Sequence, residues 1–165
     1  MKKGEVQGQV VIYILAVIIA SMILLYGYGV VKDLVSSQEN ILIVTFKEDV
    51  RSEVDRKSYE FRNVETLKFE LPQYFDEACV VDLDKANDPL QERDLLNKIG
   101  SYVLIKNSVQ SKVKRNFFLL NNGLINDGFY AGDLSIPDGF SCIPINTGQL
   151  ELRFEALGKE GVKIS

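Results

Sequence analysis

Hydrophobic residues are concentrated near the start of this 165-residue chain. Of the 26 residues from Val6 to Val31, 20 are apolar and none is charged. The most apolar part, Val10–Val31, would extend about 33 Å as an α-helix, enough to cross the hydrocarbon core of a bilayer. A cleaved secretory signal has a shorter apolar region and ends in small residues. The pattern therefore predicts a hydrophobic helix over residues 10–35 that spans a membrane.

The charges on either side of this segment predict how the chain crosses the membrane. Lys2 and Lys3 precede the segment, whereas Lys32 and Asp33 cancel one another behind it. Because the more basic flank stays in the cytoplasm, we expect residues 1–9 to be cytoplasmic and residues 36–165 to form an extracytoplasmic domain. The chain is then a single-pass protein of the cell membrane, and membrane lipid is its first expected partner.

After the apolar segment, the pattern is that of an amphipathic helix. Ser36–Glu39 has the form of a capping box, in which Ser and a Glu three residues later satisfy the free amides of a helix start. Apolar residues then recur at helical spacing: Ile43, Phe46, Val50 and Val54. Charged residues from Lys47 to Lys57 fill the positions between them. Those from Glu48 to Glu53 are expected on a solvated face, with a charged docking site as the alternative. We expect a second helix to begin at Ser36 and to pack one face on a sheet.

Beyond Tyr59 the period changes to that of short strands. Leu67–Leu71 alternates between apolar and polar residues and ends at Pro72, and Leu150–Glu155 shows the cleanest alternation in the chain. Turn signals rich in Asn, Asp and Gly separate the runs of the last third. The expected strands are 67–71, 79–83, 116–120, 128–136, 140–145, 149–156 and 162–164.

Two short helices complete the predicted fold. Asp88 followed by Pro89 predicts a helix start, and this helix should end at Gly100. Another helix is expected over residues 103–113. We therefore predict an α+β fold: a single N-terminal membrane helix, then an amphipathic helix and a small β-rich ectodomain whose sheet covers that second helix. The sheet should be mostly antiparallel because the links between strands are short.

Composition narrows the functions that this chain can have. It contains no histidine, which excludes Ser-His-Asp and Cys-His catalysis and zinc sites with histidine ligands. The formal net charge of −4 argues against a nucleic-acid partner, because neutralising phosphates requires an excess of Lys and Arg. Enzymes based on carboxylates or lysines stay open, but no catalytic spacing stands out. We expect no enzymatic activity and no cofactor.

The chain has two cysteines, Cys79 and Cys142, both in the part expected outside the cytoplasm. Disulfides persist in that environment, and each cysteine lies in an apolar run. We therefore expect a disulfide, with two buried free thiols as the alternative. A redox-active pair is not favoured, since the C-x-x-C spacing is absent.

The segment Asp82–Asp88 gathers carboxylates in the manner of a calcium loop. Counted from Asp82 with EF-hand spacing, Ala86 falls on a ligand position, Asn87 on the glycine position and Arg93 on the closing glutamate. The EF-hand motif therefore fails. A strand end, a turn and a helix cap at Asp88 explain the same residues, and a different oxygen-ligand loop is the alternative.

Basic residues collect before a pair of phenylalanines in the middle of the domain. They are Lys106, Lys112, Lys114 and Arg115. Basic groups beside aromatic rings can bind nucleic acids or anionic glycans. The preferred interpretation is a solvated helix end in front of a buried strand that contains Phe117 and Phe118.

The first nine residues resemble the class III signal of archaeal type IV pilin-like proteins. The resemblance rests on Lys2, Lys3, Gly4 and Glu5, a short polar stretch and an unbroken apolar helix, and covers about the first 31 residues. It implies cleavage after Gly4 by a prepilin peptidase on the cytoplasmic side, with Glu5 as the new N-terminus. The retained helix would then bundle with identical subunits in the core of a surface filament.

One residue departs from the family pattern. Many members carry a glutamate five positions after the cut, which pairs with a neighbouring subunit's new amino terminus, and this chain has Gln9 there. An amide can accept a hydrogen bond but supplies no compensating charge. Two functions stay open: a structural pilin-like subunit, or a permanently anchored extracytoplasmic protein that binds an unidentified ligand.

Overall fold

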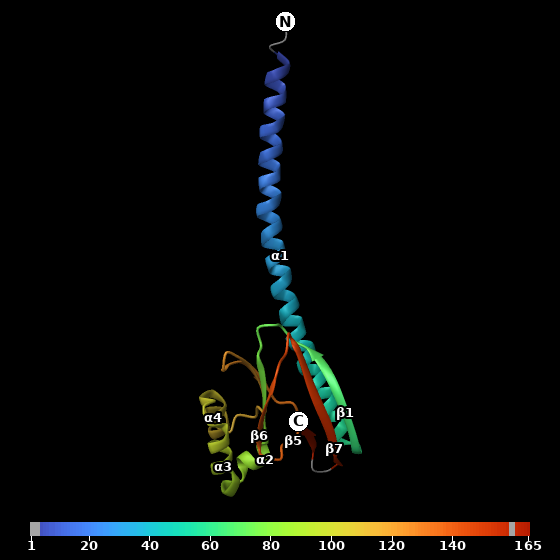
Figure 1. Cartoon of the computed structure of the whole chain (residues 1–165), viewed down its shortest axis with the longest axis vertical. Helices are drawn as coiled ribbons and strands as arrows, with labels where there is room; N and C mark the ends of the chain where they lie inside the picture. The colour runs from blue at the N-terminus through green and yellow to red at the C-terminus, as the bar shows by residue number, and fades with distance from the viewer. Residues whose placement is uncertain (1–3, 159–160) are drawn as a thin grey trace. The chain divides into compact units, whose positions relative to one another are not determined.

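The computed structural model describes residues 4–158 and 161–165, apart from the side chains of residues 4–9 and 32–37. The chain divides into two compact units, Met1–Asn40 and Ile41–Ser165 (Figure 1). The helix α1, Gly4–Ser58, contributes residues to both units.

The helix α1 contains both of the helices that the sequence pattern separates. The predicted helix start at Ser36 is wrong, because Ser36–Glu39 lies inside α1. A capping box starts a helix only where the preceding residues leave the helical conformation, and the chain has no proline before Pro72 to cause this. The predicted amphipathic helix is therefore the C-terminal part of α1. Arg56 and Lys57 occupy its last turn, where positive charge is favourable.

The unit Ile41–Ser165 contains two four-stranded sheets. The first has the order β1 (Phe61–Glu70), β7 (Gln149–Leu157), β8 (Val162–Ile164) and β5 (Leu134–Ser135). The second has the order β4 (Leu124–Phe129), β3 (Phe117–Asn121), β2 (Glu77–Val81) and β6 (Phe140–Pro144). All the neighbouring strands are antiparallel except β5 and β8, which are parallel. The predicted α+β class with mostly antiparallel sheets is confirmed.

Three short helices connect β2 to β3: α2 (Leu83–Asn87), α3 (Pro89–Ile99) and α4 (Val103–Gln110). Asp88 caps α3 with its side chain, which accepts a hydrogen bond from the backbone N–H of Leu90. Gly100 ends α3 with a φ of 55°, a conformation that suits glycine. The predicted helix from Asp88 to Gly100 is confirmed, and the next helix ends three residues before the predicted limit of 113.

The predicted strand 128–136 is wrong. Asn126–Gly128, one of the Asn-, Asp- and Gly-rich segments expected to form turns, is part of β4, and a separate two-residue strand, β5, follows. Gly128 lies opposite Phe118, and a Cβ atom there would be 2.9 Å from Cδ1 of the Phe118 ring. Glycine is therefore needed for close approach of a ring, not for a turn.

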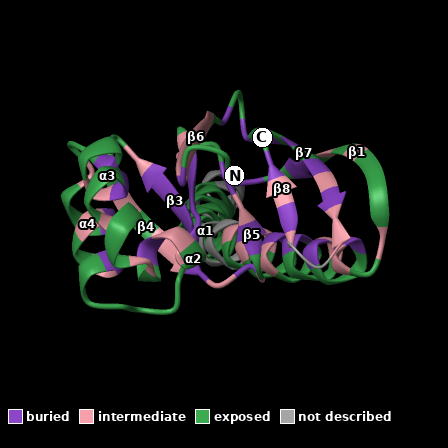
Figure 2. Cartoon of the chain, turned by 90° about the horizontal axis from the view of Figure 1, so that it is seen from below, coloured by how far each residue is buried: buried purple, intermediate pink, exposed green. Residues whose placement is uncertain are grey.

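The second sheet separates two hydrophobic cores. On β2, Ala78 and Val80 face the core that includes Phe46, Val50 and Val54 of α1. Cys79 and Val81 face the core that contains residues of α3 and α4. This alternation follows from the period of two in a strand. Buried residues accordingly line β3, β7 and β8 in Figure 2, and the predicted apolar face of the amphipathic segment is confirmed.

Candidate functional site: an apolar segment and a charged helix end

The apolar segment Val10–Val31 is the most distinctive feature of the unit Met1–Asn40. Its large apolar side chains are exposed, from 49% for Ile18 and Ile19 to 78% for Tyr26. By length and composition this part of α1 can cross a membrane, although a signal sequence would meet the same criteria. Exposing so much apolar surface to water is unfavourable, so the segment requires a lipid or protein environment.

The side chains of the predicted processing signal lie outside the part of the chain that the structure describes. Lys2 and Lys3 lie outside the described residues. Gly4, Glu5 and Gln9 belong to the first turns of α1, but their side chains are outside the description. Processing after Gly4 therefore stays a prediction from the sequence.

Cys79 and Cys142 form a disulfide bond between neighbouring strands. They are direct cross-strand partners of β2 and β6, with an S–S distance of 1.99 Å. Cys79 is fully buried in the second core, so the bond fixes the edge strand β6 to the interior of the domain. The structure contains the predicted disulfide, while the oxidising location from which it was predicted stays a prediction.

A carboxylate lies beside this disulfide. Ligand atoms of Glu77, Cys79 and Cys142 lie within 4.8 Å of one another. Metal binding by cysteine requires thiolates, and both sulfur atoms are in the S–S bond. The Glu77 carboxylate accepts a hydrogen bond of 2.8 Å from the Tyr102 hydroxyl, which raises the pKa of Tyr102 together with burial. In the disulfide form this group is a structural contact between β2 and the start of α4.

The carboxylate of Asp82 is used for helix capping. One oxygen accepts hydrogen bonds from the backbone N–H groups of Asp84 (3.0 Å) and Lys85 (3.1 Å). The other accepts from the backbone N–H of Ile136 at 3.1 Å. Because Asp82 is buried and both its oxygens are occupied, this arrangement favours the interpretation as a strand end and helix cap over an oxygen-ligand loop.

The basic cluster adopts the predicted arrangement. Lys112, Lys114 and Arg115 are exposed after the end of α4. Phe117 and Phe118 are buried, so their rings cannot stack on bases or sugars. The ammonium group of Lys114 lies 4.3 Å from the ring centre of Tyr130. The geometry is therefore that of a solvated helix end in front of a buried strand.

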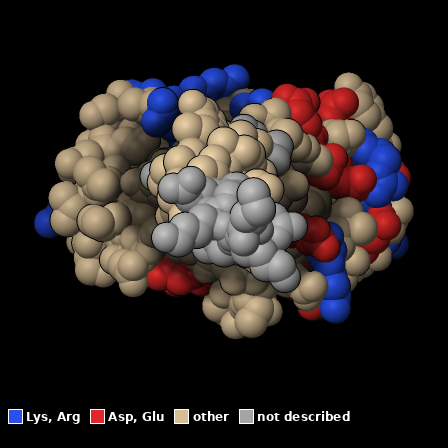
Figure 3. Space-filling view, turned by 90° about the horizontal axis from the view of Figure 1, so that it is seen from above, with Lys and Arg blue, Asp and Glu red and all other residues tan. Residues whose placement is uncertain are grey.

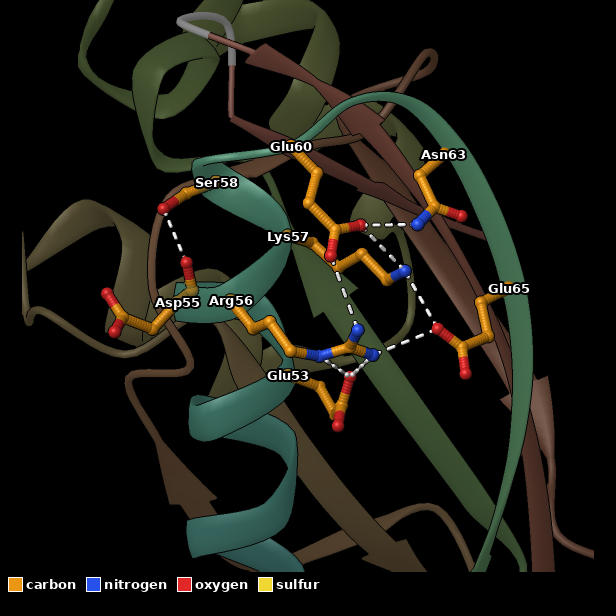
Figure 4. A network of polar contacts seen from close by, with 8 residues as sticks. All are labelled: Glu53, Asp55, Arg56, Lys57, Ser58, Glu60, Asn63 and Glu65. Carbon is orange, nitrogen blue, oxygen red and sulfur yellow. Dashed lines mark hydrogen bonds and ion pairs between the residues drawn. The ribbon is translucent and has the colours of Figure 1, made fainter.

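A charged network joins the end of α1 to β1 (Figure 4). Lys57 is fully buried, and its Nζ lies 3.0 Å from a carboxylate oxygen of Glu60 and 2.8 Å from one of Glu65. Arg56 contacts Glu53 and both of these glutamates. Asn63 donates a hydrogen bond to Glu60. The network therefore connects the last turns of the helix to an edge strand.

The network shifts the pKa values of its members toward the charged forms. Burial lowers the pKa of Lys57, but hydrogen bonds to Glu65 and Glu60 outweigh it, and the net pKa is raised. Hydrogen bonding to Lys57 lowers the pKa of Glu60 and of Glu65, and Arg56 adds to the effect on Glu65. Hydrogen bonds to Glu53 and Glu65 raise the pKa of Arg56. All four groups are charged at neutral pH.

Sequence reasoning missed the burial of Lys57, which it counted among the charged residues between the apolar positions of the helix. Lys57 lies seven residues after Val50 and three after Val54, and therefore on the same apolar face of α1. This spacing alone could have indicated that Lys57 is buried. Its partner Glu65 belongs to a different element, so the pattern of the helix alone does not reveal the pairing.

Comparison with known proteins found no relative: no protein-family model, no curated protein and no solved structure matches the chain.

Proposed function

We propose that this chain is a structural, pilin-like subunit of the cell envelope that assembles through its N-terminal hydrophobic helix. The observation that carries the proposal is the exposed, uncharged segment Val10–Val31. In a filament the segment would be covered by the same segment of neighbouring subunits, and before assembly it would be covered by lipid. Both environments remove its apolar side chains from water.

The first residues of the chain support processing that keeps this segment. Lys2, Lys3, Gly4 and Glu5 match the class III signal in order and spacing, and the apolar helix follows them directly. In this proposal a prepilin peptidase cuts after Gly4. A cut at that point removes four residues and leaves Val10–Val31 on the mature chain, ready for bundling with identical helices.

The domain adds a second line of support. The disulfide Cys79–Cys142 is suited to an extracytoplasmic location, where thiols are oxidised. The domain would therefore form the outer layer of the filament. We propose no enzymatic activity for it, because histidine is absent and the carboxylates of Asp82 and Glu77 are engaged in structural hydrogen bonds.

Gln9 favours a second candidate function. Without a glutamate at that position, the new amino terminus lacks the charge partner that orders subunits in many relatives of this type. The alternative is a permanently anchored protein whose extracytoplasmic domain binds a ligand or another membrane protein. In that case Met1–Gly4 remains on the chain.

N-terminal sequencing and cell-surface shearing test the proposal together. The mature protein should begin at Glu5, and it should be recovered with material sheared from the cell surface. The variant Gly4→Val should block cleavage, while Gly8→Val, a change at the next glycine, should leave the start at Glu5. Retention of Met1–Gly4 with all of the protein in the membrane fraction would overturn the filament proposal and support the anchored alternative.

A further inference from the structure

Four loops, each taken with the adjoining residues of its helix or strand, meet at one end of the unit Ile41–Ser165. They are 71–76, 100–104, 121–125 and 144–149, and we call this surface the neutral end. The backbone N–H of Leu71 donates to the carbonyl of Gly148 at 2.8 Å, and that of Asn122 donates to the Asp76 carboxylate at 2.7 Å. The loop 100–104 joins them across a shallow hollow of about 140 Å³ that it shares with Gly123–Ile125.

The first turns of α1 within this unit lie at the same end. The ring of Phe46 is 5.5 Å from that of Phe69, which is close to the end of β1 and the start of loop 71–76. Residues 41–45 precede Phe46 and so extend toward the neutral end. Ile41 and Val44 are 63% and 59% exposed there.

The neutral end differs in charge from the rest of its unit. Residues 41–165 include 16 basic and 20 acidic side chains, but Asp76 is the one charged residue in the four loops. Large apolar side chains are exposed among them: Val103 (62%), Leu104 (51%) and Leu124 (66%). Figure 3 views the molecule from this side, and uncharged side chains predominate over its left half, the half in which Figure 2 labels α4 and β4.

We infer that the neutral end contacts the surface of the lipid bilayer, an inference that rests on the proposed membrane insertion of Val10–Val31. Ile41 follows Val31 by ten residues, so even a fully extended chain would hold it within about 35 Å of the segment. This tether acts in every single chain, whether or not a second copy is present. It therefore favours lipid over a second copy as the occupant of this surface.

The charge distribution agrees with a lipid partner. Anionic headgroups repel an acidic domain, and the repulsion is smallest where the domain presents the fewest acidic groups, here Asp76 alone in the four loops. Exposed Leu and Val side chains gain free energy when they enter the interfacial region. The neutral end combines both properties.

Tryptophan fluorescence of the full chain in phosphatidylcholine vesicles tests the inference, because the chain contains no tryptophan of its own. The probes are Leu104→Trp and Leu124→Trp at the neutral end. The matched control is Leu90→Trp at the start of α3, an 86% exposed leucine beyond the opposite end of β2. Leu24→Trp reports on the apolar segment. Lipids brominated at shallow and deep acyl positions serve as quenchers.

We expect shallow quenchers to reduce the fluorescence of the Leu104→Trp and Leu124→Trp variants at least twofold, with no change for Leu90→Trp. Deep quenchers should act on Leu24→Trp. If only Leu24→Trp is quenched, the contact with the bilayer is overturned while membrane insertion stands. If Leu24→Trp is not quenched either, the insertion on which both proposals rest fails. Blue-shifted emission at residue 124 that depends on protein density, without lipid quenching, would assign the surface to a second copy and overturn the inference.

Discussion

The ammonium group of Lys57 lies 2.8 Å from the carboxylate of Glu65, and this contact ties the last turn of α1 to the edge strand β1. Lys57 has no exposed surface, whereas the Glu65 side chain is 40% exposed. Loss of the pairing is therefore more unfavourable for the lysine, whose charge has no access to water, than for the glutamate.

Changing either member of the pair should have unequal effects. Glu65→Gln leaves a buried ammonium with one carboxylate fewer, so it should lower the midpoint of denaturant unfolding. Lys57→Met removes the buried charge itself and should lower the midpoint less. Glu70→Gln, on the same strand but outside the network, is the control and should have little effect. A larger loss for Lys57→Met than for Glu65→Gln would contradict this account.

The same network makes stability depend on pH at both extremes. The pKa values of Glu60 and Glu65 are lowered from about 4.5, so their contribution is complete above that pH and is lost as the pH falls through the lowered values. The pKa of Lys57 is raised from 10.5, so its contribution is complete below that pH and is lost as the pH rises further.

The melting temperature, measured from pH 2 to pH 12, should therefore show a plateau. It should fall in acid below the ordinary glutamate pKa of 4.5 and in base above the ordinary lysine pKa of 10.5. The double variant Glu60→Gln/Glu65→Gln should have a lower plateau and a weaker loss of stability in acid. An acid limb identical to that of the unchanged chain would show that other carboxylates control it.

Phe46 should be the most sensitive position of the domain part of α1. Its ring contacts those of Phe69, Phe117 and Phe129, which come from both sheets. Phe46→Ala should cost about 3–5 kcal/mol of unfolding free energy, since it leaves a cavity between the sheets. Val44→Ala, two residues earlier and 59% exposed, should stay within about 0.5 kcal/mol of the unchanged chain. Equal losses at the two positions would contradict the assigned helix face.

Removing the disulfide should cost about 2–5 kcal/mol of stability. We expect the Cys79→Ser/Cys142→Ser variant to unfold at lower denaturant concentration than the oxidised chain. A reductant should lower the stability of the unchanged chain and leave that of the variant as it is. Intact mass measured without reductant should show no free thiol, and two alkylated cysteines would contradict the bond.

Asp82→Ala should destabilise the domain by about 2 kcal/mol or more, because three backbone N–H groups lose their acceptor. Asp84→Ala, in the first turn of α2, removes an exposed carboxylate and should cost far less. Calcium should not change the melting temperature of the unchanged chain. A calcium-dependent rise that Asp82→Ala abolishes would restore the cation-binding interpretation of this segment.

Local signals predicted the elements that depend on neighbouring residues. The helix α3 follows from Asp88, Pro89 and Gly100, which start and stop it by backbone chemistry alone. Strand β7 follows from the alternation of Leu150, Leu152 and Phe154, all buried on one face.

The features that the sequence did not predict depend on distant residues. Ser36–Glu39 has the form of a helix start, but the helix that precedes it continues through it. Gly128 is explained by the Phe118 ring, and the burial of Lys57 by Glu65, and in both cases the partner lies on another element. The parallel pairing of β5 with β8 joins residues far apart in the chain, and the spacing of apolar residues within a strand does not reveal which distant strand pairs with it.

The contribution of α1 to the domain core determines where the chain can be divided. Phe46, Val50 and Val54 fill the space between the sheets, so a fragment that begins at the first strand would lack part of its own interior. A fragment that begins at Ile41 keeps these residues and omits the apolar segment. A protease that cuts before Ile41 would therefore separate an intact domain from the apolar segment, whereas one that cuts between Phe46 and Val54 would divide the core of that domain.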